Sequence, residues 1–234
     1  MVAISTWVPT FAKRGIGLDR VSGLPWGLRK GAWPSCGVCS VPLAFIGQLA
    51  HAPGRIDLGR EGRLLYAFLC KNLDTMLECG LSAGVPGNTD RAHAIVTVDD
   101  AEPTESEPPD GLLDHAPALV VTEWSMRQED VPDAALEPLL YGLNQQRSDW
   151  PEVWKTHEIP PLRGTKIGGI PAWVQDPIMN DMLPDPHHFR YVAQWSDQER
   201  VGKSKAWTTL EVGRLFLLAH GDDGLDFELY HMAR

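Results

Sequence analysis

The feature that most constrains this chain is an internal similarity between its beginning and its end. The matching pairs, the first two at the same offset of 146 residues, are VSGLP at 21–25 with IGGIP at 167–171, FIGQL at 45–49 with YVAQW at 191–195, and LLYAF at 64–68 with RLFLL at 214–218. Because the three blocks recur in one order, we interpret the chain as a duplicated unit of glycine turn, strand, connection and strand. Chance similarity between two Gly-Pro turns is the alternative.

The chain as a whole is predicted to adopt a mainly β fold of the α+β class with pseudo-symmetric halves. Alanines and leucines at helical spacing predict a helix from Val131 to Leu143, and a second short helix is expected from Asp149 to His157. We expect a first half at 1–98, an acidic, helix-containing connector at 99–163 and a second half at 164–234, with the halves packed as one globular domain. Strands are predicted near 42–50, 62–70, 93–98, 117–124, 189–195, 212–220 and 225–231.

The net charge of −10 is concentrated in one part of the chain. Between Asp99 and Glu158 there are 15 acidic residues and three basic ones, so this middle segment carries the whole imbalance. It begins with AEPTESEPPDG at 101–111, a composition typical of an exposed loop or linker. We therefore expect no direct binding of nucleic acid, and either a basic protein partner or an ordinary solvated face.

Four cysteines form the strongest chemical signal. Cys36 and Cys39 make a C-x2-C knuckle around Gly37, and Cys70 and Cys79 follow later in the first half. A knuckle brings two thiolates to one tight turn, as a tetrahedral zinc site requires. We predict a closed, structural zinc site made by all four, although the wide Cys70–Cys79 spacing also leaves inert buried thiols or a redox pair open.

The longest apolar runs fall short of the roughly 20 residues that cross a bilayer, so we predict no transmembrane helix and no membrane partner. At the N-terminus the basic residues follow the apolar stretch, unlike those of a signal peptide. The expected compartment is the cytoplasm, where free thiols and metal sites are more common than disulfides.

The same residues carry a resemblance to a known family. GLPW at 23–26, WPSCGVC at 33–39, PLAFIGQL at 42–49, RLLYAFLC at 63–70 and KIGGIPAWVQ at 166–175 resemble bacterial YwqG-like proteins. The first four blocks are also similar to the N-terminal zinc module of the programmed cell death protein 2 family. The resemblance covers roughly 21–98 and 164–231, and the acidic middle has no counterpart in it.

The resemblance implies an internally duplicated α+β fold with no established enzymatic activity. It also implies two roles: a chaperone that holds a basic ribosomal-type protein, or an immunity protein that neutralises a toxin. We therefore predict a non-catalytic protein-binding module. The candidate partner-binding residues are Glu102, Glu105, Glu107, Asp110, Trp124, Trp150 and Trp154. Core packing is the alternative role for these tryptophans.

Gln48 and Gln194 occupy the same place in the two repeats. Polar residues at equivalent positions of apolar strands can line a groove between the halves and bind a peptide or small ligand. Alternatively, each amide satisfies buried backbone groups.

An enzyme is the other reading, although the chain contains no familiar catalytic motif. The candidates for general acid–base chemistry are Asp185, His187 and His188, together with a cluster of His220, Asp222, Asp223 and Asp226. Such groups more often belong to a surface loop, for the histidine pair, and to a hairpin turn, for the aspartate cluster.

Overall fold

A single antiparallel sheet of ten strands dominates the protein, whose computed structural model describes residues 1–29, 31–72, 79, 92–101, 104–112, 116–141, 162–173, 189–210 and 213–232. The strand order is β12-β11-β8-β7-β1-β6-β2-β3-β4-β5, and a separate hairpin joins β9 to β10. The edge strands β12 and β5 approach each other, so the sheet is nearly closed. The strands are β1 (Val2–Ala12), β2 (Arg20–Val21), β3 (Ala44–Ala50), β4 (Leu64–Leu69), β5 (His93–Val98), β6 (Leu119–Val131), β7 (Lys166–Gly168), β8 (Arg190–Ser196), β9 (Gln198–Val201), β10 (Ser204–Trp207), β11 (Arg214–His220) and β12 (Asp226–Met232).

The predicted mainly β fold is confirmed, and each of the seven predicted strands corresponds to a strand of the sheet. One short helix, α3 (Asp133–Tyr141), lies within the predicted window of Val131 to Leu143. The second predicted helix, at 149–157, falls outside the described residues. No helix in the described part of the chain has the length and hydropathy needed to cross a lipid bilayer.

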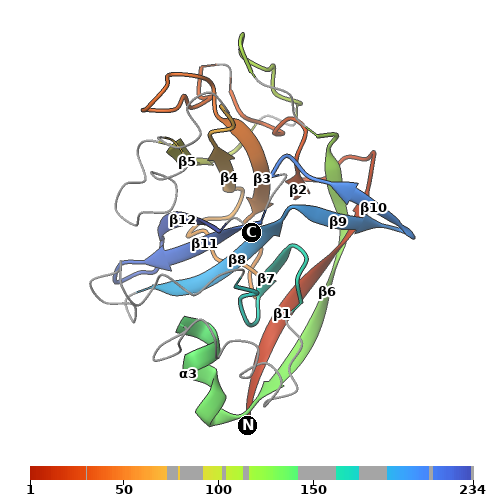
Figure 1. Ribbon diagram of the computed structural model, residues 1–234, viewed down its shortest axis with the longest axis vertical. Helices are drawn as coiled ribbons and strands as arrows, with labels where there is room; N and C mark the ends of the chain where they lie inside the picture. Colours follow the sequence, from red (N-terminus) through yellow and green to blue (C-terminus); the bar gives the residue numbers. More distant parts are fainter. Residues whose placement is uncertain are drawn as a thin grey trace.

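The sheet order has a two-fold correspondence about the pair β1 and β6, which run side by side along the molecule (Figure 1). Moving outward from this pair, β7, β8, β11 and β12 on one side match β2, β3, β4 and β5 on the other. Each of the innermost strands is short, and each is paired to a long central strand.

The registers of the two sides agree residue by residue. Arg20 pairs with Gln48 as Lys166 pairs with Gln194, which keeps the offset of 146 residues. The ladder between β3 and β4 shifts register across Ile46, and that between β8 and β11 shifts across Val192, its counterpart. The alignment read from the sequence is therefore also the alignment of the strand pairings.

The glycine turns of the repeat have the same backbone conformation in each half, and both pack closely against another segment. Ser22 and Gly23 have φ values of 61° and 72°, and Gly168 and Gly169 have values of 68° and 71°. A Cβ on Gly23 would lie 2.5 Å from the Ala118 Cβ, and one on Gly169 would lie 2.0 Å from the Thr6 Oγ1. Gly23 and Gly169 thus combine a left-handed backbone with the close approach of another segment, and only glycine allows both at one position.

Strands β8 and β11 of the second half are buried on both faces. Along β11, Leu215 and Leu217 pack in the main core, while Phe216 and Leu218 belong to a second cluster on the opposite face. Helix α3 contributes to that second cluster through Ala135 and Leu139, which are also buried. This explains why β11 is a continuous apolar run rather than an alternating one.

The N-terminal strand β1 was not predicted, and it is one of the two central strands. It pairs with β6 along its whole length but with β7 only at Thr6 and Trp7. Pro9 therefore lies where β1 has a sheet partner on one side only, a place where proline is tolerated. The proline and the mixed burial of this segment explain why its sequence pattern did not predict a strand.

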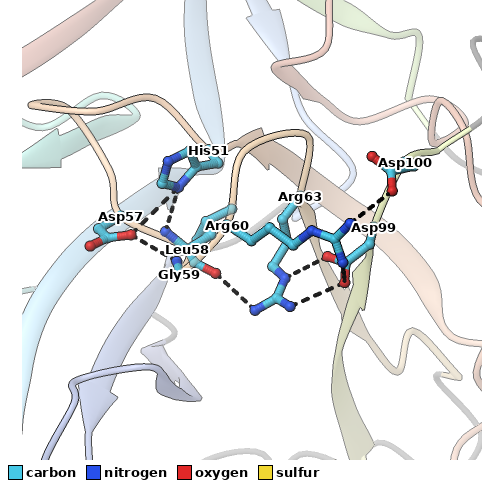
Figure 2. Close-up of polar contacts among 8 residues, drawn as sticks. All are labelled: His51, Asp57, Leu58, Gly59, Arg60, Arg63, Asp99 and Asp100. Atoms are coloured by element: carbon cyan, nitrogen blue, oxygen red, sulfur yellow. Dashed lines mark hydrogen bonds and ion pairs between the residues drawn. The ribbon is translucent and has the colours of Figure 1, made fainter.

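The connection between β3 and β4 is held by charged residues at the end of β5. The Arg63 guanidinium donates to both Asp99 oxygens, at 2.7 and 3.2 Å, and Arg60 bridges Asp99 and Asp100 at 3.2 Å (Figure 2). The hydrogen bond from Arg63 holds the pKa of Asp99 below its ordinary value. Within the same loop, His51 Nδ1 accepts the Leu58 N–H at 3.0 Å.

Candidate metal centre

The C-x2-C knuckle is a tight backbone turn between residues 35 and 42. The Cys36 N–H donates to the Val41 carbonyl and the Ser40 N–H to the Cys36 carbonyl, both at 2.8 Å. Ser40 has a φ of 62°, which reverses the chain after Cys39. The Val38 N–H lies 3.4 Å from the Cys36 Sγ and donates to it. The knuckle thus donates one backbone N–H to a sulfur of its own.

The structure brings all four cysteines together. Their Sγ atoms all lie within 4.8 Å of one another. The Cys36 and Cys79 sulfurs are 3.8 Å apart, and those of Cys39 and Cys70 are 3.7 Å apart. The two sulfurs of the knuckle thus each meet one sulfur from the later pair.

These distances fit a metal ion better than a disulfide. A disulfide requires sulfurs about 2.05 Å apart, and all four thiols are free. A tetrahedron with metal–sulfur bonds of about 2.3 Å has edges of about 3.8 Å. The Cys36–Cys79 and Cys39–Cys70 sulfur distances match that edge. The four cysteines therefore form a plausible metal site with every position of a tetrahedron supplied by the protein.

The site is shielded from water. Cys36 and Cys79 are buried, and Cys39 and Cys70 are partly buried against the main core. Burial raises the pKa of the Cys70 thiol well above its ordinary value. A bound dication favours the thiolate form and so opposes this effect of burial.

Aromatic packing connects the knuckle to the sheet. Trp33 precedes it, donates its indole N–H to the Leu43 carbonyl at 2.8 Å, and meets the Phe68 ring edge-on at 5.4 Å between centroids. Phe68 lies on β4, and Cys70 follows the last residue of that strand. The Cys70 N–H is in turn bonded to the Ala92 carbonyl at 2.7 Å, at the start of β5. The ligand cluster thus joins the knuckle, β4 and the entry to β5.

Part of the acidic segment is fixed to the first half by backbone hydrogen bonds. The Gly27 N–H donates to the Thr104 carbonyl at 2.7 Å, and the Ser106 N–H to the Pro25 carbonyl at 2.9 Å. The Leu28 N–H also donates to the buried Ser106 hydroxyl at 3.0 Å. The predicted partner-binding residues in this segment, Glu105, Glu107 and Asp110, are exposed, whereas Glu102 lies outside the described residues.

Of the three predicted tryptophans, Trp124 is the one that lies within the described residues. Trp124 is partly buried on β6, its indole N–H donates to Asp19 Oδ2 at 2.7 Å, and its ring faces the Arg55 guanidinium at 4.9 Å. Asp19 also bonds Arg55 at 2.8 Å and accepts the Ala50 N–H at 2.6 Å. Trp150 and Trp154 lie outside the described residues.

Gln48 and Gln194 are both fully buried, but their bonding differs. Each side-chain oxygen accepts a backbone N–H at the same repeat position, from Trp26 at 2.8 Å and from Ala172 at 2.9 Å. The Gln194 nitrogen also donates to the Leu162 and Gly164 carbonyls, at 3.2 and 2.7 Å. Among the described residues the Gln48 nitrogen has no hydrogen-bond partner. Gln194 is thus hydrogen-bonded through both its oxygen and its nitrogen, whereas Gln48 is bonded through its oxygen.

The candidate catalytic residues fall into two places. Asp185, His187 and His188 lie outside the described residues. His220 pairs with Asp226 at the end of the β11–β12 hairpin, and the exposed Asp222 and Asp223 belong to its turn. The Leu225 N–H donates to Asp223 Oδ1 at 3.0 Å, as in an Asx turn.

Several buried charged residues were not predicted. Arg20 and Lys166 occupy matching repeat positions, are almost fully buried, and donate to the matching carbonyls of Leu24 and Ile170. Burial lowers the pKa of Lys166 to about 8. Glu199, on β9, accepts the Thr165 N–H at 2.7 Å. The repeat aligns a basic residue with a basic residue before each glycine turn, and this signal could have identified the first pair.

The sequence matches no protein-family model and no curated protein.

Proposed function

We propose that this chain is a non-catalytic protein-binding module whose acidic segment meets a basic partner protein. The observation that carries the proposal is the exposure of Glu105, Glu107 and Asp110 on a segment that is bonded to the first half. Hydrogen bonds join Thr104 and Ser106, which flank Glu105, to residues 25–28. Binding to a segment that is already held in place loses little conformational entropy, and opposite charge speeds the approach of the partner.

The metal of the four-cysteine site is proposed to be zinc with a structural role. Four thiols and a tetrahedral spacing are the donor set that zinc prefers. Cys36, Cys39, Cys70 and Cys79 would fill every position, so no open coordination site would be left for substrate or water. Bound zinc would cross-link the knuckle to the end of β4.

The symmetry of the sheet supports an origin by duplication, and with it the proposed relationship to YwqG-like proteins. The matched registers, bulges and glycine turns are hard to attribute to chance similarity of two turns. The acidic segment, which lies outside the resemblance, then becomes the part that distinguishes this chain. We propose that it sets partner choice, while the two repeat halves form the scaffold.

A basic toxin and a basic ribosomal-type protein are the two partners that fit this chemistry. An immunity protein and a chaperone share the requirement for an acidic surface that competes with a partner's natural anionic contacts. Affinity purification from the native host followed by mass spectrometry identifies which class is bound.

Charge reversal tests the surface itself. The triple variant Glu105→Lys, Glu107→Lys and Asp110→Lys should slow association with the captured partner by at least about tenfold in low salt, because steering is lost. A variant with the same change in net charge elsewhere, Glu61→Lys, Glu123→Lys and Asp222→Lys, serves as control, since these side chains are exposed and dispersed.

The result that would contradict the proposal is equal association by both variants, with melting temperatures near that of the native protein. That outcome would remove the acidic segment from the interface. Recovery of no basic protein from the native host would contradict the partner class.

A further inference from the structure

A cavity of about 290 Å³ lies between β1 and the β9–β10 hairpin. Three apolar residues of β1, Val8, Pro9 and Phe11, line one wall. The hairpin provides charged residues, and the hairpin stands out from the side of the sheet (Figure 1). This volume is close to the lower end of the range for small-ligand sites, about 300 to 1,000 Å³.

The inner end of the cavity carries a buried carboxyl group. Glu199 lines the cavity and is only 6% exposed. Its Oε1 accepts the Thr165 N–H at 2.7 Å. Burial raises the pKa of Glu199 to about 7, although Arg214 on β11 acts in the opposite direction. A carboxylate in this position gains from a cationic group brought next to it, because such a group offsets the burial of its charge.

The outer end of the cavity carries two positive charges. Arg200 and Lys205 both line it, both are exposed, and they are direct cross-strand partners in the hairpin. Directly opposed residues place their side chains on the same face of a two-stranded ribbon, and like charges there are unfavourable. An anionic group between the two side chains relieves that repulsion.

We propose that this cavity binds a small zwitterion of the α-amino acid class. The ammonium group meets Glu199 at the inner end, and the carboxylate meets Arg200 and Lys205 at the outer end. The apolar wall from β1 accepts an aliphatic or aromatic side chain. This site is separate from the acidic segment, so it does not depend on the proposed protein-binding function.

The test is isothermal titration calorimetry of the full chain with L-leucine and L-phenylalanine. Two relatives of leucine each lack one charge: N-acetyl-L-leucine has no ammonium, and L-leucine amide has no carboxylate. We expect at least one amino acid to bind, with leucine binding at least about tenfold more tightly than either relative if leucine is the better fit. No binding by either amino acid, or equal binding by leucine and both relatives, overturns the proposal.

Variants locate the site. Glu199→Gln and Lys205→Gln should each weaken binding of the better amino acid by at least about tenfold. Lys203→Gln changes an exposed charge in the hairpin turn that does not line the cavity, and it should keep native affinity. Lys205 is exposed, so its variant remains informative if Glu199→Gln disturbs folding. Unchanged affinity in Lys205→Gln, or equal loss in Lys203→Gln, contradicts the assignment.

Discussion

Gln48 and Gln194 show how the same residue at the same repeat position can make different contributions. Gln194 bonds one amide N–H and two carbonyls of the backbone, and it also accepts the Tyr191 hydroxyl at 3.3 Å. Gln48 bonds the Trp26 N–H alone. Buried backbone groups that lose a partner are costly, so the number of partners decides the effect of a substitution.

We predict that Gln194→Leu lowers the free energy of unfolding by about 2 to 4 kcal/mol, because it leaves three backbone groups without their partner. Gln48→Leu, the matched change, should cost about 1 kcal/mol, since it orphans one N–H and also removes an unpaired nitrogen. Urea denaturation of both variants measures the difference. Equal losses in the free energy of unfolding would show that the different hydrogen bonding of the two glutamines does not affect stability.

At the residue scale the sequence was most informative where chemistry depends on few residue types. Cysteine spacing predicted which four residues cluster, because only cysteine offers sulfur ligands in that pattern. The buried Glu199 and Lys166 were missed, since charged residues are normally exposed and burial depends on the folded sheet. The repeat provided the one sequence signal for Lys166, through its alignment with Arg20.

At the scale of elements, the strands that were predicted and those that were missed differ in their exposure to solvent. β3, β4, β8 and β11 are buried on both faces, and their apolar runs are easy to recognise. β1 contains a proline, and the β9–β10 hairpin has an exposed, polar sequence. Their pairing is set by neighbours distant in sequence, which local patterns do not report.

The β9 strand carries a carboxyl whose ionisation opposes folding. The folded-state pKa of Glu199 is about 7, whereas that of an unfolded Glu is about 4.3. Because the folded state holds the proton more tightly, the stability that Glu199 contributes is full below about pH 4 and is lost as the pH rises to 7. Asp197 raises this pKa further, and Arg214 lowers it.

We predict that Glu199→Gln is more stable relative to the native protein at pH 8 than at pH 4.5, by about 1 to 3 kcal/mol. The amide cannot ionise, so the pH-dependent loss disappears. Urea denaturation at the two pH values measures the shift. A difference between variant and native protein that is constant with pH would show that Glu199 titrates normally.

At the scale of the whole molecule, the two halves meet through a glycine and a tryptophan. A Cβ on Gly47 of β3 would lie 2.1 Å from Nε1 of Trp195 on β8, and the Trp195 side chain is fully buried. Gly47 therefore permits a close approach of the first half to the second. The repeat predicted equivalent strands, but it did not predict that these two strands pack against each other.

We predict that Gly47→Ala destabilises the protein by at least about 1 to 3 kcal/mol through overpacking. Combined with Trp195→Phe, which removes the indole atoms nearest the new methyl group, it should cost less than the sum of the two single changes. Thermal or urea denaturation of the three variants provides the coupling. Additive costs would mean that Gly47 does not hold the halves together through Trp195.

The central claim is that a structural zinc ion joins the knuckle to β4 and supports the first half. The most direct measurement is the zinc content of the protein purified without added metal, compared with Cys39→Ser, by inductively coupled plasma mass spectrometry. Our account predicts one zinc per native chain, a much lower content in the variant, and a lower melting temperature when the zinc is lost. A zinc-free native protein whose melting temperature is the same as that of Cys39→Ser would contradict it.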